Sequence, residues 1–92
     1  MKYQIVRTAR AGVFAGMVTR KGTEATIKNA RRLWYWKGAA SLSELAVRGV
    51  KYPNECKFPS PVASITVTEV IEVLDTTKEA RKIIEGVPEW KA

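Results

Sequence analysis

The residues best suited to chemistry form one run, from Ala30 to Glu44, in which arginines, aromatic side chains and small residues follow one another. Trp and Tyr rings offer flat faces on which bases or guanidinium groups stack. Arg and Lys supply the positive charge that a phosphate group requires. We therefore predict that the run is a ligand-binding site, with these candidate residues: Arg31, Arg32, Trp34, Trp36, Lys37, Gly38, Ala39, Ser41 and Ser43.

The end of this run leads into a predicted helix. Ser41 and Glu44 have the spacing of a capping box, in which each side chain accepts a hydrogen bond from the other's backbone N–H. A helix N-terminus is also a natural anion site, because its first N–H groups are unpaired and carry partial positive charge. Two explanations stay open: a phosphate site at the helix start, or a cap that needs no ligand.

A structural role is the alternative for the rest of the run. Trp34 and Trp36 could belong to the core, and the two arginines could pair with acids of the second half of the chain, Glu55, Glu69 or Glu72. However, the three consecutive aromatic side chains at 34–36 cannot all be buried on one side of a strand. At least one ring must therefore lie in a second core, a subunit interface or a ligand site.

The residue inventory argues against catalysis. The chain contains no histidine and one cysteine, Cys56. This composition excludes Ser-His and Cys-His pairs and argues against a zinc site. The run also lacks the Gly-Lys-Ser/Thr ending of a P-loop and the glycine spacing of a dinucleotide-binding fold. We predict a non-catalytic protein with no cofactor and no metal site.

The formal net charge of +7 is concentrated in residues 1–50, where ten Lys or Arg accompany two Glu. Residues 51–92 hold six basic and seven acidic residues. A basic half of this kind favours an anionic partner, either a nucleotide or a nucleic acid, or an acidic protein surface. The alternative is a basic surface that only keeps the protein in solution.

Short antiparallel strands are predicted for the first part of the chain. Residues 3–8, 13–19, 24–28 and 31–36 have strand character, with turns at 20–23 and 29–30. In the last of these strands, alternation places Arg31 and Leu33 on one face with Tyr35, and Arg32, Trp34 and Trp36 on the other.

A helix over 41–47 that ends at Gly49 follows, and then a proline-containing loop over 51–61. Residues 65–74 fit both a helical face and a strand, and their Val, Ile and Thr content favours the strand. A last helix is predicted to open with a cap at Thr76 and to stop at Gly86, with Trp90 docked on the body. The fold class is α+β: a small antiparallel sheet or partly open barrel of about five strands with two short helices.

The length of 92 residues indicates a single domain, 1–92, near the lower size limit for an adequate core. Oligomers often supply the missing buried surface at this size, so we expect a homo-oligomer. No apolar stretch of about 20 residues could span a membrane. The first residues also lack the apolar segment of a signal peptide, and we expect a cytoplasmic protein with no membrane partner.

Several segments resemble a family of small uncharacterised proteins of tailed bacteriophages and prophages. The most specific is the Arg-Arg-x-Trp-Tyr-Trp-x-Gly-Ala run at residues 31–39. Residues 5–8, 11–13, 55–58 and 68–73 also carry the resemblance, which extends over nearly the whole chain. It implies a phage origin, and no mechanism.

Phage origin suggests a role against host defences, because small non-enzymatic phage proteins often have one. By this analogy the protein would be a sponge that holds a cyclic-nucleotide-type immune signal without turning it over. It would act in the cytoplasm of the infected bacterial host. The alternatives are a small β-barrel module that binds nucleic acid and a protein–protein inhibitor of a host defence factor.

Overall fold

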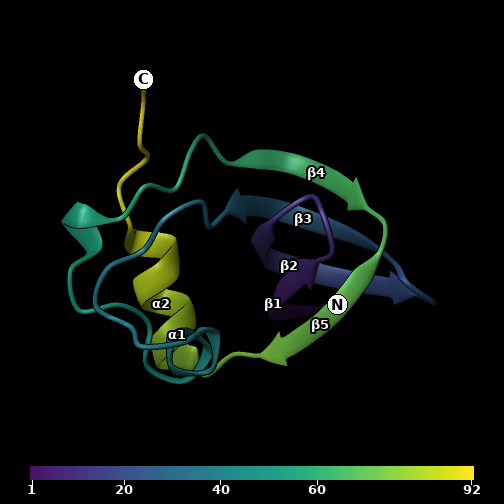
Figure 1. The fold of residues 1–92 in the computed structure, drawn as a ribbon, viewed down its shortest axis with the longest axis horizontal. Helices are drawn as coiled ribbons and strands as arrows, with labels where there is room; N and C mark the ends of the chain where they lie inside the picture. Colours follow the sequence, from purple (N-terminus) through teal and green to yellow (C-terminus); the bar gives the residue numbers. More distant parts are fainter.

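The computed structural model describes residues 1–92 and contains five strands, two α-helices and one 3-10 helix (Figure 1). The strands are β1 (Lys2–Thr8), β2 (Val13–Lys21), β3 (Glu24–Arg32), β4 (Val62–Val67) and β5 (Val70–Asp75). The helices are α1 (Leu42–Arg48), η1 (Pro53–Glu55) and α2 (Lys78–Gly86). Neither α-helix has the length and apolar character that crossing a membrane requires.

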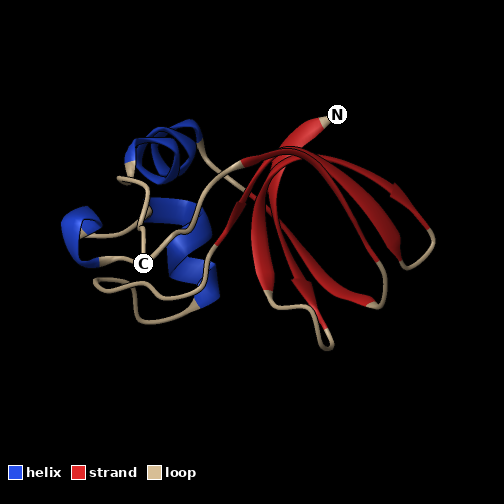
Figure 2. Cartoon of the chain, turned by 90° about the horizontal axis from the view of Figure 1, so that it is seen from above, coloured by secondary structure: helices blue, strands red, loops and turns tan.

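All five strands form one antiparallel sheet in the order β4-β3-β2-β1-β5. Only Thr68 and Glu69 connect β4 to β5, although these strands occupy opposite edges. The sheet must therefore curl to bring its two edges together at this corner, and Figure 2 shows this curvature with the helices on one side. The architecture is the predicted α+β fold, with an open antiparallel sheet of five strands and two helices.

The predicted turn at 29–30 is wrong, because β3 continues through it to Arg32. The chain forms a β-bulge there: Asn29 and Ala30 together lie opposite the single residue Gly16 of β2. Asn29 has a left-handed φ of 52°, which produces the local bend without ending the strand. A Cβ at Gly16 would lie 2.6 Å from Ile27 Cγ2, so the bulge needs glycine at this point of β2.

The bulge sets which arginine of β3 is buried. An extra residue in one strand inverts the alternation of side chains beyond it. Ala30 therefore shares the face of Ala25 and Ile27, and Arg31 points to the face that the helices cover. The predicted strand over 31–36 is correspondingly too long, since β3 ends at Arg32 and only a single bridge follows, at Tyr35.

The segment 65–74 is extended, as we predicted, but it belongs to two strands and not to one. β4 ends at Val67 and β5 begins at Val70. Glu69 has a left-handed φ of 57°, and its carboxylate accepts hydrogen bonds from Arg10. Because sequence alternation continues across this corner, the sequence pattern predicts a single strand.

Both α-helices begin at a side-chain cap. Ser41 caps α1 as predicted, and Gly49 ends that helix with a φ of 72°. The cap of α2 is Thr77, whose hydroxyl accepts from the Ala80 N–H at 3.0 Å, so the prediction of Thr76 is wrong by one residue. The Thr76 hydroxyl instead donates to the Tyr3 carbonyl at 2.8 Å.

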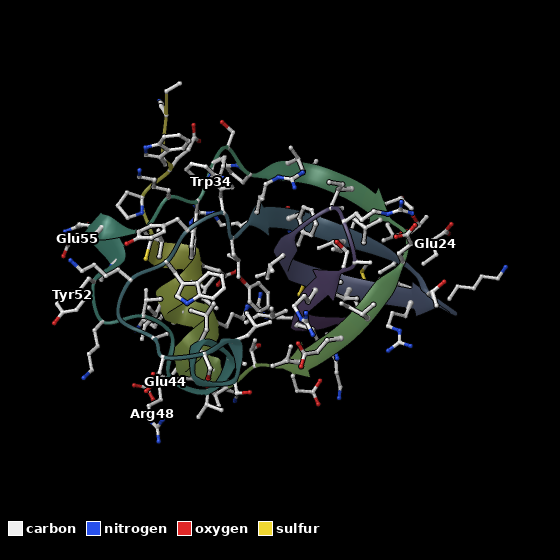
Figure 3. All side chains as sticks on the ribbon, viewed as in Figure 1. Glu24, Trp34, Glu44, Arg48, Tyr52 and Glu55 are labelled. Carbon is white, nitrogen blue, oxygen red and sulfur yellow. The ribbon has the colours of Figure 1, made fainter.

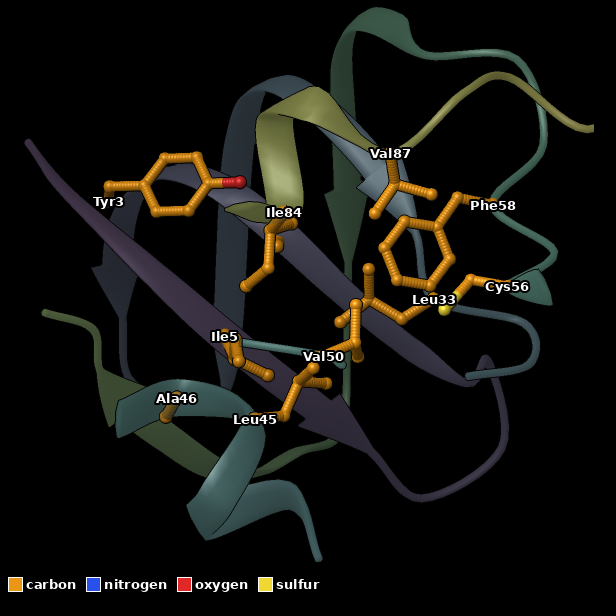
Figure 4. Packing of buried hydrophobic residues seen from close by; sticks show 11 residues of the cluster. Tyr3, Ile5, Leu33, Leu45, Ala46, Val50, Cys56, Phe58, Ile84 and Val87 are labelled. Atoms are coloured by element: carbon orange, nitrogen blue, oxygen red, sulfur yellow. The ribbon is translucent and has the colours of Figure 1, made fainter. Parts of the chain in front are cut away.

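The core has two parts, one on each face of the sheet. Helices α1 and α2 cover the first part and contribute Leu45 and Ile84, which pack with Ile5, Leu33 and Phe58 (Figure 4). The second part lies on the other face of the sheet and contains Val6, Phe14, Val18, Ala25, Ile27, Ala30 and Val67. β3 contributes Ala25, Ile27 and Ala30 to the second part only, whereas its residue Arg31 reaches the helix side, where it donates to the Ile84 carbonyl.

Candidate functional site

Three predicted site residues line one cavity of about 400 Å³. They are Arg32 at the end of β3, and Trp34 and Trp36 in the segment that follows it. The connection between β1 and β2 forms the opposite wall. The full lining is Arg10, Ala11, Gly12, Val13, Arg32, Leu33, Trp34 and Trp36.

The β1–β2 connection is held in place by its own hydrogen bonds. The Gly12 carbonyl accepts from both the backbone N–H and the hydroxyl of Thr8, at 3.0 and 2.9 Å. The Ala11 N–H donates to the Thr8 hydroxyl oxygen at 2.8 Å. Gly12 has a φ of 102°, a conformation that side-chain-bearing residues rarely adopt. The cavity wall is therefore a fixed turn.

Arg32 connects the two walls of the cavity through a hydrogen bond and has no carboxylate partner. Its Nη1 donates to the Ala11 carbonyl at 2.7 Å, and its guanidinium lies 4.5 Å from the centroid of the Phe14 ring. No carboxylate lies within ion-pair distance of it. By contrast, Arg10 is paired with Glu69 through two hydrogen bonds, which raise the pKa of Arg10. Arg32 is thus the uncompensated cation of the cavity.

The two tryptophans contribute differently to the cavity. Trp34 is 59% exposed, so its ring is available at the surface. Trp36 is half-buried and packs against the helix-side core. The cavity therefore has one exposed ring, that of Trp34, and one ring that packs against the body, that of Trp36. Aromatic rings beside a free guanidinium are groups that can stack a base and pair with a phosphate.

Arg31 lies outside this cavity, on the helix side of the sheet. It is only 7% exposed and donates to the backbone carbonyls of Ile84, Val87 and Phe58. Two of these carbonyls belong to the last turn of α2 and the residue that follows it, where a cation is favoured. Burial lowers the pKa of Arg31. The side chain holds the C-terminal part of the chain against the sheet.

Lys37 and Gly38 likewise have structural roles. Lys37 Nζ lies 2.9 Å from Glu55 Oε1, and this hydrogen bond raises the pKa of Lys37. Gly38 has a φ of 97°, and a Cβ there would lie 2.6 Å from the Lys51 nitrogen. Gly38 therefore permits a close approach of two backbone segments, joined by the hydrogen bond from the Lys51 N–H to its carbonyl.

The start of α1 is closed by its own side chains: Ser41 caps it as predicted, but Glu44 accepts from the N–H of Ala40 and not from that of Ser41. The Glu44 N–H donates to Ser41 Oγ at 3.1 Å, and the Ala40 N–H donates to Glu44 Oε1 at 2.6 Å. Ala39 packs against the helix-side core. Ser41 and Ser43 line a different hollow of the surface, and Figure 3 shows Glu44 far from Trp34. The structure thus brings three of the nine predicted residues together and places six elsewhere.

Two residues that lie beside Trp34, Lys57 and Trp90, are absent from the predicted site. The Trp90 ring stacks on the Trp34 ring, with centroids 5.2 Å apart and planes inclined by 20°. Lys57 Nζ lies within 6 Å of three ring centroids, at 5.7 Å from Trp34, 5.8 Å from Tyr35 and 5.6 Å from Trp90. The three rings at 34–36 and the prediction that Trp90 docks on the body both pointed toward this surface, but no local pattern links residues 34, 57 and 90.

Other hollows of the surface lack this combination of groups. One of about 390 Å³ lies near Tyr3 and Arg81, and it includes Asp75 and Lys2, which form an ion pair at 3.8 Å. No three His, Cys, Asp or Glu side chains gather into a cluster of the kind that holds a metal ion. Cys56 is buried, and its sulfur lies 3.5 Å from both the Lys37 nitrogen and the Tyr52 carbonyl oxygen.

A family model described as a domain of unknown function (DUF6948) matches residues 1–84. No curated protein and no solved structure matches the chain. The matched region contains all five strands and every residue that lines the cavity of Arg32, Trp34 and Trp36. Trp90 lies beyond it.

Proposed function

This chain belongs to the DUF6948 family, and we propose that it is a non-catalytic protein that binds an anionic nucleotide. The binding site is the cavity between the β1–β2 connection and the segment 32–36. Arg32 pairs with a phosphate, and Trp34 and Trp36 provide faces for the base. The protein holds its ligand and leaves it chemically unchanged.

One observation carries this proposal: the cavity combines a guanidinium that has no acidic partner with two indole rings. Each free arginine N–H can donate to a phosphate oxygen in a charge-assisted hydrogen bond. Stacking of a base on an aromatic side chain contributes about 1–3 kcal/mol. The cavity volume of about 400 Å³ falls within the usual range for small-molecule sites.

The biological setting that we propose follows from the resemblance to phage proteins. In the cytoplasm of an infected bacterium, a protein of this kind would sequester a cyclic-nucleotide-type immune signal. Two or more copies would assemble, because a chain of this size gains stability from additional buried surface. This setting extends the proposal from a binding site to an anti-defence function.

Titration calorimetry with a panel of mononucleotides, cyclic dinucleotides and ADP-ribose derivatives tests the proposal. We expect saturable binding of at least one compound, with no change in the compound after incubation. Arg32→Gln and Trp34→Ala should each weaken that binding by about tenfold or more, the loss of one charge-assisted bond or one stacking contact.

Arg20→Gln provides the matched control, because Arg20 is an exposed arginine of β2 that does not line the cavity. Flat titrations against the whole panel would contradict the proposal. Binding to long DNA or RNA that weakens steeply with salt, equally in the Arg20 and Arg32 variants, would indicate a general nucleic-acid-binding module in its place.

A further inference from the structure

Three extended segments meet beside the nucleotide cavity and form an aromatic surface. Backbone hydrogen bonds connect Tyr35 and Lys57 in both directions, at 3.2 and 2.8 Å. The Trp90 N–H donates to the Phe58 carbonyl at 2.9 Å, which fixes the C-terminal tail along the same segment. We call the side chains of Trp34, Tyr35, Lys57 and Trp90 the aromatic platform.

The rings of the platform are exposed at the surface and do not belong to the core. Its three rings are exposed to 59% for Trp34, 46% for Tyr35 and 37% for Trp90. Exposed clusters of large aromatic side chains are unusual unless they bind a partner. Trp34 belongs both to the platform and to the cavity lining, so the two features form one continuous surface.

The charge of the platform favours an anionic partner with flat groups. Lys57 lies over all three rings and forms no ion pair with a carboxylate. The nearby cation of the cavity, Arg32, is also without an acidic partner. A lysine among exposed rings, next to a free arginine, suits a phosphate that is flanked by bases.

We propose that the aromatic platform binds a second nucleobase, so that the ligand is a dinucleotide or a larger oligonucleotide signal. This inference rests on the proposed function, because the first nucleotide unit occupies the cavity. Trp34 lies between the two nucleotide units and stacks on Trp90. The Trp90 ring stacks on the second base, and Lys57 pairs with the phosphate that links the two units.

Arg31 is the positioning residue for this second half of the site. Its guanidinium donates to the Val87 and Phe58 carbonyls, and the same Phe58 carbonyl accepts from the Trp90 N–H. The buried arginine thereby joins the two segments that carry Lys57 and Trp90. Arg31 therefore affects the site by positioning Lys57 and Trp90, without contacting the ligand.

The test compares the affinity for a dinucleotide with the affinity for its component mononucleotide by calorimetry. We expect the wild-type protein to favour the dinucleotide by at least tenfold, the gain from one additional stacked base. Trp90→Ala should bring the ratio of the two affinities close to one, and Lys57→Gln should lower it in the same direction. Trp90→Phe, which keeps a stacking ring, should restore most of the ratio.

Tyr52→Ala is the matched control. Tyr52 is an exposed ring with a lysine nearby, Lys37 at 5.8 Å, but it does not belong to the platform, and Figure 3 shows it apart from Trp34. The ratio of affinities should not change in this variant. Thermal unfolding of every variant shows whether the fold is retained.

The outcomes separate the two proposals. If mononucleotides bind in an Arg32-dependent manner but dinucleotides bind no tighter, the second base site is overturned and the proposed function stands. If the ratio is high and Trp90→Ala leaves it unchanged, the platform is not the second base site and its rings serve a protein partner. If no nucleotide binds, the proposed function itself fails.

Discussion

The guanidinium groups of Arg31 and Arg32 act on opposite faces of β3, although the two residues are adjacent in sequence. Arg31 is buried beneath the end of α2 and donates to three backbone carbonyls. Arg32 lies over Phe14 on the other face and lines the cavity. The bulge at Asn29 determines this assignment, because it inverts the alternation of β3 just before the two arginines. One arginine therefore supports the fold, and the other is available to a ligand.

This division predicts opposite effects for two matched substitutions. Arg31→Gln should lower the free energy of unfolding by roughly 2–4 kcal/mol, because buried carbonyl groups lose their donors. Arg32→Gln should change stability by less than about 1 kcal/mol, because its exposed side chain has only one hydrogen bond to lose. Urea denaturation measures both. Equal losses in the two variants would contradict the finding that Arg31 is buried and Arg32 is exposed.

The bulge can be tested at Gly16. Gly16→Ala places a Cβ 2.6 Å from Ile27 Cγ2 and 2.7 Å from the Lys28 carbonyl oxygen. Overpacking of this kind costs roughly 1–3 kcal/mol, and the shift should also disturb the side-chain alternation of β3. The control is Gly86→Ala at the end of α2, where no atom lies within 4 Å of the added Cβ. Chemical denaturation should show a loss only for the first variant; unchanged stability of Gly16→Ala would argue against the bulge.

The start of α1 gives a prediction that separates stability from binding. Ser41→Ala removes a capping hydrogen bond of 3.1 Å and should destabilise the protein by about 1 kcal/mol. Nucleotide affinity should stay within twofold of wild type, because this helix start does not line the cavity. Denaturation and calorimetry on the same sample measure the two effects. A marked loss of affinity in a folded Ser41→Ala protein would indicate that the helix start belongs to the binding site.

Tyr3 makes stability depend on alkaline pH. Its hydroxyl is buried and has no hydrogen-bond partner. Burial, with the nearby carboxylate of Glu85, raises the pKa of Tyr3 from 10.0 to about 12. Since the fold favours the protonated phenol, this contribution to stability is complete below pH 10 and is lost as the pH rises toward 12.

Tyr3→Phe removes this pH dependence. In the same variant, stability at neutral pH should be within about 1 kcal/mol of wild type, because the hydroxyl gives up no hydrogen bond. Denaturation from pH 8 to pH 12, a range that includes the ordinary pKa of 10.0 and reaches the raised pKa of Tyr3 of about 12, measures the difference between the two proteins. If both proteins lose stability in parallel over this range, another group is responsible.

Local sequence patterns predicted most of the fold because the interactions that decide it are local. The Ser41 cap, the Gly49 helix end and the first two strands all follow from residues within a few positions of one another. The predicted number of about five strands agrees with the structure partly because two errors cancel. One observed strand, β3, was divided into two at Asn29, and two observed strands, β4 and β5, were joined across Glu69.

Both errors occur at residues with a left-handed φ that are not glycine, Asn29 and Glu69. Their conformations depend on distant partners: the Gly16 position of β2 in one case and Arg10 in the other. The same limit applies to the site. The sequence predicts a binding site near Trp34, but it could not show that Arg31 is buried or that Trp90 stacks on Trp34.

We propose that a nucleotide occupies the cavity beside Trp34 and Trp36, and the indole N–H groups of the protein report on it directly. The chain contains three tryptophans, so a proton–nitrogen correlation spectrum of the labelled protein shows three indole N–H signals. Single Trp→Phe variants assign each signal. On titration with a mononucleotide, we expect saturable shifts of the Trp34 and Trp36 signals, and a dinucleotide should shift the Trp90 signal in addition. If all three signals stay in place at saturating concentrations of every nucleotide in the panel, the claim is wrong.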